Sequence, residues 1–401
     1  MTTYTISDED RDRLAEHLNY VSAHSETMMG YPSARDFDYS SLMPFLSYSL
    51  NNVGDPFVAS TSKVDSREFE REVLTWWAEI MNAPKDNWWG YVTNGGTEGN
   101  LYGLYLAREL HPNSIVYYSK DTHYSVSKNL HFLNMRSIMI RALPNGEIDY
   151  DDLRETIRVN RDVTPIIFAN IGTTMTEAKD DIGRIRSIID DLAVSEYYIH
   201  SDAAMCGAIA PFLDNKPNFD FADGAHSMSI SGHKFIGSPI PCGMVLALKQ
   251  NVNRIARSIA YIGTLDTTVT GSRNGITPLF MWYAMRAMGK EGFKQRVEYS
   301  LQLAEYAEQK LRTLGKRMVG WEEAQHGNKV SKDTVIYSWL SEEAALNCAK
   351  QGFDVILQPG QSTYLDMTQD YAPNEPGVDW AAVIPLENAY QYEPLAEVPD
   401  S

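Results

Sequence analysis

The sequence has 401 residues, 43% of them hydrophobic, which is enough for a large core and one or two domains. A formal net charge of -18 repels nucleic acid and anionic membranes, so neither is expected as a partner. The sequence contains no long apolar run that predicts a transmembrane helix, and its N-terminal residues do not resemble a secretory signal. Its three cysteines lie far apart without zinc-site spacing, so a cytoplasmic enzyme without a bound metal is expected.

Two helical patterns come first along the chain. Ser7, with Asp10 three residues later, is typical of a helix N-cap. Apolar residues then follow at helical spacing: Leu14, Leu18 and Val21. Segment 66–82 repeats the pattern with Ser66 as the predicted cap. Its apolar face is expected to carry Phe69, Val73, Trp76 and Ile80.

Short apolar runs then alternate with helical patterns. Strands are predicted within 114–119, 165–174, 197–204, 227–234 and 243–249. Segment 180–193 predicts a helix whose inward side carries Ile182, Ile185, Ile189 and Leu192. This alternation predicts an α/β fold with a mainly parallel sheet covered on both faces. Ligands of such sheets bind at the carboxyl ends of the strands.

The stretch "YVTNGGTEGNLYGLYL" (91–106) joins a predicted strand to a predicted helix. Gly95 and Gly96 let the backbone approach a ligand, and Thr97 adds a hydroxyl group. Free N–H groups and the helix dipole favour an anion there. The stretch lacks the lysine of a nucleotide-binding P-loop and the glycine spacing of a dinucleotide fold. An anion cup and a plain glycine turn capping a helix are both consistent with it.

Two charged residues also follow predicted strands. Asp202 is expected to be partly buried, so its carboxylate needs a partner, either a helix N-terminus or a protonated ring nitrogen. Small alanines after it, Ala204 among them, leave room for a flat ring. Lys234 is either an exposed loop lysine or a nucleophile, and its neighbours Ser231 and His233 could bind a phosphate.

Taken together, these parts are those that pyridoxal 5′-phosphate (PLP) requires. The cofactor needs an anion cup for its phosphate, a carboxylate for its pyridinium nitrogen and a lysine for its aldehyde. His123, in "YYSKDTHYSVSK", could stack on the pyridine ring; the alternative is an ordinary buried histidine. PLP is therefore the expected cofactor.

The same residues lie in stretches that resemble the group II PLP-dependent amino-acid decarboxylases, over about residues 10–312. The stretches are "YVTNGGTEGNLYG", "YYSKDTHYSV", "IIFANIGTT", "SGHKFIGSPIPCG" and "TVTGSRNG". Within that family the sequence is most similar to bacterial histidine decarboxylases, with the serine decarboxylases of plants second. The resemblance implies a PLP-dependent transferase fold (aspartate aminotransferase-like, fold type I) and decarboxylation of L-histidine to histamine and CO2.

The resemblance also implies a role for each site residue. Lys234 would join the cofactor aldehyde, Asp202 would pair with the pyridinium, and His123 would stack on the ring and touch the substrate. The phosphate would be held by Gly96, Thr97, Ser231 and His233. Thr174 would lie beside the cofactor, and Ser272 and Arg273 near a subunit interface. By the same resemblance, the chain is expected to form a homodimer or homotetramer around a small amino-acid substrate.

The C-terminal part of the sequence departs from this family. Instead of a small closing domain, residues from about 314 resemble the last barrel strands of β-N-acetylhexosaminidases. The acidic pair that such enzymes need, Asp-Glu after His-x-Gly-Gly, does not occur in the sequence. The predicted division is an N-terminal arm (1–55), a PLP-binding domain (56–265), a connection (266–313) and this foreign-looking segment (314–401). Three alternatives stay open: another substrate such as serine, a PLP-binding but inactive fusion, and a carbohydrate-binding protein.

Overall fold

The computed structural model describes residues 4–27, 37–58, 62–255, 257–259 and 264–313. The segment 314–401, predicted to be foreign to the decarboxylase, lies outside them. The described residues fall into two units: 4–27 and 306–313 belong to one, the rest to the other. Within the described chain, no helix is long and apolar enough to cross a membrane.

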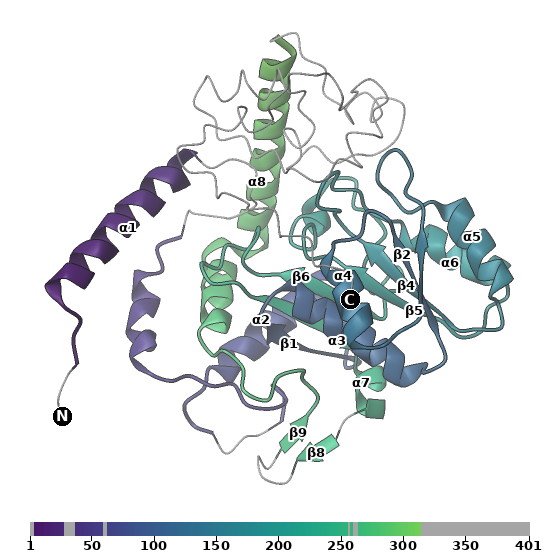
Figure 1. Ribbon diagram of the computed structural model, residues 1–401, viewed down its shortest axis with the longest axis horizontal. Coiled ribbons are helices and arrows are strands. Elements are labelled where there is room, and N and C mark those ends of the chain that lie inside the picture. The colour runs from purple at the N-terminus through teal and green to yellow at the C-terminus, as the bar shows by residue number, and fades with distance from the viewer. Residues whose placement is uncertain (1–3, 28–36, 59–61, 256, 260–263, 314–401) are drawn as a thin grey trace, which may run out of the picture. The chain divides into compact units, whose positions relative to one another are not determined.

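The order of helices and strands can be followed in Figure 1. The helices are α1 (Asp8–Thr27), η1 (Ser40–Ser47), α2 (Arg67–Ile80), α3 (Gly96–Leu110), α4 (Ser125–Phe132), α5 (Tyr150–Val159), α6 (Ile182–Asp191), η2 (Ala210–Phe212), α7 (Lys249–Ile255) and α8 (Thr277–Thr313). The strands are β1 (Trp88–Thr93), β2 (Ile115–Ser119), β3 (Ser137–Ile140), β4 (Pro165–Asn170), β5 (Tyr198–Asp202), β6 (Ser227–Ser231), β7 (Gly243–Leu248), β8 (Arg257–Ile259) and β9 (Thr264–Asp266).

Helix α1 begins where the sequence predicts. The Ser7 hydroxyl donates to Asp10 Oδ2 at 2.6 Å and accepts from the Asp10 N–H at 3.1 Å, which confirms the cap. The predicted apolar residues Leu14, Leu18 and Val21 do follow at helical spacing. Their side chains are exposed.

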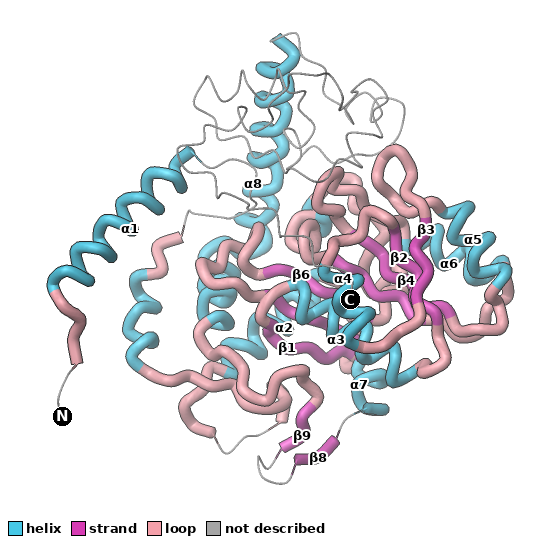
Figure 2. The backbone as a smooth tube through the Cα atoms, viewed as in Figure 1, coloured by secondary structure: helices cyan, strands magenta, loops and turns pink. Residues whose placement is uncertain are grey.

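Seven strands form one mixed sheet in the order β1-β7-β6-β5-β4-β2-β3. Strands are coloured magenta in Figure 2. Neighbours from β6 to β3 pair in parallel, as the alternating pattern predicts. Strand β7 lies between β1 and β6 and is antiparallel to both. Because two reversals cancel, β1, β5 and β6 all point the same way, and their carboxyl ends meet at one edge.

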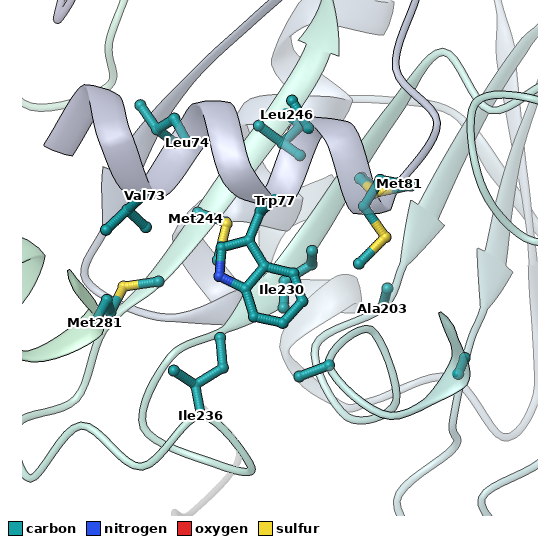
Figure 3. Close-up of a cluster of buried hydrophobic side chains, with 14 of the residues drawn as sticks. Val73, Leu74, Trp77, Met81, Ala203, Ile230, Ile236, Met244, Leu246 and Met281 are labelled. Carbon is teal, nitrogen blue, oxygen red and sulfur yellow. The ribbon is translucent and has the colours of Figure 1, made fainter. Parts of the chain in front are cut away.

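Apolar residues cover both faces of the sheet. Helices α3, α4 and α7 pack on one face. Helix α2 and the first part of α8 pack on the opposite face over β6 and β7, and α5 and α6 on that same face over β2, β4 and β5. Figure 3 shows Trp77 of α2 among side chains such as Met244, Leu246 and Met281. Two-sided covering explains why these strands read as nearly continuous apolar runs.

The predictions for α2 are confirmed in part. Ser66 occupies the predicted N-cap position, but its side chain makes no capping hydrogen bond, because the hydroxyl donates to the Gly275 carbonyl at 2.6 Å. Of the predicted apolar face, Val73 is buried and Phe69, Trp76 and Ile80 are half-buried against the core. The prediction missed other deeply buried residues of α2: Glu70, Leu74, Trp77 and Ala78. Aromatic residues of α8 pack on Phe69 and Trp76. Their ring centroids are 5.0 Å from Trp282 and 5.5 Å from Phe293, respectively.

Candidate active site

The site lies where the carboxyl ends of β1, β5 and β6 meet. Gly243, at the start of β7, pairs with Thr93 on one side and Ser231 on the other, which brings the ends of β1 and β6 together. Asp202, at the end of β5, pairs with Ser229 of β6. Such an edge is where α/β proteins bind ligands.

The turn between β1 and α3 forms the predicted cradle. Gly95 has φ = 133°, a conformation that side chains rarely adopt. A Cβ on Gly96 would lie 2.7 Å from Ala204 Cβ and 3.1 Å from Ser231 Oγ, so three segments meet there with no room for a side chain. The N–H groups at the start of α3 therefore open onto the ends of β5 and β6.

Asp202 and Lys234 form the charged centre of the site. Asp202 is buried and accepts from the Ala204 N–H at 3.2 Å and from Asn100 Nδ2 at 2.9 Å. Burial raises the pKa of Asp202, while these two donors and nearby Lys234 act to lower it. Burial lowers the pKa of Lys234, against the attraction of Asp202 and Cys206.

His123 lies near the same lysine, in the turn before α4. Its Nδ1 accepts from Ser125 Oγ at 2.8 Å and from the Ser125 N–H at 3.3 Å, which leaves the proton of the neutral ring on Nε2. Burial, together with Lys234 and Lys128, lowers the pKa of His123 to about 4. The imidazole is therefore uncharged at neutral pH.

The remaining predicted cofactor-binding residues lie in turns or at a helix start that follow strands of the sheet. Thr97 and Thr174 are exposed, one at the start of α3 and the other in the turn after β4. His233 shares the turn after β6 with Lys234; its Nδ1 is 2.8 Å from the Cys242 carbonyl, and its ring lies 3.7 Å from a Cβ position on Gly95. Ser272 is exposed and accepts from Asn51 Nδ2, and Arg273 is buried; their predicted place near a subunit interface stays a prediction.

Sequence reasoning missed two buried residues behind Asp202. Asn100 of α3 contacts the carboxylate directly, and His200 of β5 contacts Asn100. His200 precedes Asp202 by two positions on a strand, so both side chains point to the same face. That spacing in "YYIHSDAA" was the available signal.

The donor set fits PLP. The glycine cradle suits a phosphate, and the buried carboxylate suits a protonated ring nitrogen. The partly desolvated lysine suits an aldehyde. Among the described residues, no group of histidines, cysteines and carboxylates could hold a metal ion. Fold and site together define a PLP-dependent enzyme with a mixed, mainly parallel sheet.

The chain belongs to the pyridoxal-dependent decarboxylase family, whose conserved domain matches residues 20–330. It is 49% identical over 310 residues to a histidine decarboxylase of Mesorhizobium japonicum, covering 77% of this chain and 84% of that protein. It is 47% identical over 313 residues to a histidine decarboxylase of Morganella morganii, covering 78% of this chain and 83% of that protein.

Solved structures share the fold. L-methionine decarboxylase from Streptomyces sp. 590 superposes with a TM-score of 0.72 at 24% identity, covering 78% of this chain and 82% of that one. Glutamate decarboxylase from Lactobacillus brevis superposes with a TM-score of 0.64 at 18% sequence identity, covering 80% of this chain and 78% of that one. At these identities the superpositions speak for the fold alone.

A second family matches the C-terminal part of the chain. The catalytic domain of glycosyl hydrolase family 20 matches residues 283–400, which agrees with the resemblance to hexosaminidases. The two family matches overlap from 283 to 330. The chain therefore combines segments related to two unrelated enzymes.

Proposed function

We propose that the chain decarboxylates L-histidine, releasing CO2 and histamine. The observation that carries this proposal is the 49% identity over 310 residues with the histidine decarboxylase of Mesorhizobium japonicum. The grouping of Lys234, Asp202 and His123 at one edge of the sheet supports it.

The phosphate of PLP binds at the start of α3 in this proposal. Backbone N–H groups of Gly95, Gly96 and Thr97 provide donors, and the Thr97 hydroxyl adds another. Ser231 and His233 approach from the end of β6. The position of Ser231 Oγ, 3.1 Å from where a Cβ on Gly96 would lie, supports this assignment because it brings both halves of the cradle together. Thr174 is assigned to a place beside the cofactor.

The three central residues divide the chemistry. Bound PLP supplies an electron sink for the electron pair left when the α-carboxylate departs as CO2. Asp202 holds a proton on the ring nitrogen, and Ala204 leaves space for the flat ring. The lowered pKa of Lys234 increases its neutral, nucleophilic fraction. His123 remains uncharged near neutral pH and would stack on the ring.

CO2 release from L-histidine by the purified, PLP-loaded chain tests the function. L-serine is compared because of the alternative reading, and L-methionine because of the related fold. Lys234→Ala provides the background rate, with a loss of about 10³-fold or more expected for a residue that reacts with the cofactor. Release from serine or methionine without release from histidine contradicts the proposed substrate.

An inactive fusion is the main alternative, and the glycosyl hydrolase match favours it. Such a chain binds PLP through Lys234 but releases no CO2 from any amino acid. Recording the visible spectrum of the same sample therefore separates it from a decarboxylase. Cofactor absorbance without CO2 from the whole panel identifies the inactive fusion.

We also propose a homodimer or homotetramer in the cytoplasm. The exposed apolar residues of α1 and the exposed Phe45, Leu46 and Tyr48 around η1 support burial against a second copy. The buried thiols of Cys206 and Cys242 support a reducing compartment. Light scattering coupled to size-exclusion chromatography measures the oligomeric state.

A further inference from the structure

A line of polar side chains runs behind Asp202 through the interior of the protein. Asn100 Nδ2 lies 2.9 Å from Asp202 Oδ2, and Asn100 Oδ1 lies 3.0 Å from His200 Nε2. On the far side of that ring, His200 Nδ1 lies 2.7 Å from Ser227 Oγ. Asn100, His200 and Ser227 are buried, and they come from α3, β5 and β6.

With Asp202 ionised, the protons of this line have one consistent arrangement. Asn100 turns its amide nitrogen to the ionised carboxylate, so its oxygen faces His200 and accepts from Nε2–H. A neutral imidazole with its proton on Nε2 has an acceptor at Nδ1, and the Ser227 hydroxyl donates to it. Hydrogen bonds then run in one direction, from Ser227 to Asp202.

Other arrangements conflict with Asp202 being ionised. If His200 carried its proton on Nδ1, Asn100 would have to turn its amide nitrogen toward Nε2. Its oxygen would then face the Asp202 carboxylate, which requires a protonated acid. A doubly protonated ring is excluded near neutral pH because burial lowers the pKa of His200 to about 3.

The backbone leaves space for this line. A Cβ on Gly103 of α3 would lie 2.2 Å from His200 Nδ1, and one on Gly99 would lie 2.3 Å from Ser229 Oγ. With Gly96, these glycines fall at spacings of three and four, so they share one helix face. That face lies against β5 and β6, which lets Asn100 reach Asp202.

We propose that Asn100, His200 and Ser227 are positioning residues that keep Asp202 ionised and aimed at the ring nitrogen of PLP. The inference rests on the proposed PLP site but not on the choice of substrate. None of the three touches the cofactor in this proposal; each acts through the next. The competing explanation is a polar bridge that only joins helix to sheet.

Four variants of the full chain test the proposal: Asn100→Ala, His200→Ala, His200→Gln and, as a control, His226→Asn. His226 is another largely buried imidazole, whose Nδ1 accepts from the Ile199 N–H at 3.1 Å, which an asparagine oxygen can replace. The readouts are the dissociation constant of PLP and the ¹⁵N NMR signal of ring-labelled PLP. Neither requires turnover.

We expect Asn100→Ala to weaken PLP binding about tenfold to hundredfold, the usual effect of losing a hydrogen bond to a charged group. Its ring-nitrogen signal should move toward the unprotonated position. His200→Ala should weaken PLP binding about tenfold and move the ring-nitrogen signal in the same direction. His200→Gln, whose amide can replace Nε2–H, should stay within about threefold of wild type.

Equal PLP binding and equal ring protonation in Asn100→Ala and in the control overturn the proposal. If only His200→Ala matches the control, the role of His200 is overturned. Should His200→Ala not fold, Asn100→Ala still decides whether the contact with Asp202 supports PLP binding, and weak PLP binding by His200→Gln contradicts the role assigned to Nε2–H. A wild-type chain that binds PLP but releases no CO2 from histidine contradicts the proposed substrate only; a chain that binds no PLP contradicts both.

Discussion

Glu70 and Arg273 form an ion pair in the protein interior, although 203 residues separate them in the sequence. Glu70 also accepts from the Val92 N–H and from Asn52 Nδ2, both at 2.9 Å. Arg273 donates to the Gly54 carbonyl at 2.9 Å. The pair therefore links α2, β1 and the segment before α8. Strand β1 is the strand that leads into the glycine cradle.

Removing the cation should destabilise the fold strongly. Arg273→Met leaves the Glu70 carboxylate buried without a counter-ion, which typically costs ~3–5 kcal/mol of unfolding free energy. Urea denaturation of the PLP-loaded protein measures it. Lys290→Met is the matched control, because its pair with Glu79 is exposed and should contribute only about 0–1 kcal/mol. Equal losses in both variants contradict the expectation.

Gly103→Ala should destabilise the protein although alanine is the better helix former. Alanine gains ~1 kcal/mol of helix propensity, but its methyl group would occupy the position of the His200 ring. We expect a net loss of about 1–2 kcal/mol with weaker PLP binding. Thermal unfolding and a PLP titration measure both. Gly271→Ala, at a glycine with nothing within 4 Å of a Cβ, should change neither.

Lowering the pH should reduce the unfolding free energy of the wild type more than that of His226→Asn. Burial lowers the pKa of His226 from 6.5 to about 4. Between those values the unfolded state binds the extra proton and the folded state does not, so lowering the pH favours unfolding. We expect the difference in unfolding free energy to be constant above pH ~6.5 and to shift by up to ~3 kcal/mol near pH 4. A pH-independent difference would falsify the assignment.

Polar substitutions on α1 should weaken the proposed dimer. Leu14→Gln combined with Leu18→Gln removes two exposed leucines, each worth about 1.5–3 kcal/mol when buried. Light scattering over a dilution series should show dissociation at a concentration at least about tenfold higher than for wild type. Val159→Gln, at an exposed valine of α5, provides the control. Unchanged assembly in the double variant removes α1 from the interface.

Local patterns were sufficient for much of this fold. The Ser7 cap, the helix at 182–191 and the strands around Asp202 and Lys234 all depend on neighbours in the sequence, and the structure has them. The glycine turn at 95–96 was also recognisable, because its conformational demand is local. The closeness of Asp202 and Lys234 followed from one rule about the carboxyl edge of a parallel sheet.

Long-range packing decided the rest. The buried face of α2 depends on where Trp282 and Phe293 of α8 lie, which no local period encodes. Nothing near Arg273 in the sequence indicates that its partner is Glu70. The direction of β7 was equally hidden, since an apolar run reads the same whether its neighbours are parallel or antiparallel. Asn100 and His200 were missed because polar residues inside an apolar pattern indicate a network only once the facing element is known.

The place of β7 also sets an order of events during synthesis on the ribosome. Among the described strands, β1 pairs only with β7, so Thr93 must wait until Gly243 has been made. At about 5–20 residues per second, that delay lasts roughly 8–30 s. Throughout it the nascent segment "WWGYVT" has an unpaired, strongly apolar edge, the kind that attracts other chains. Production of this protein should therefore respond to chaperone supply and to translation speed.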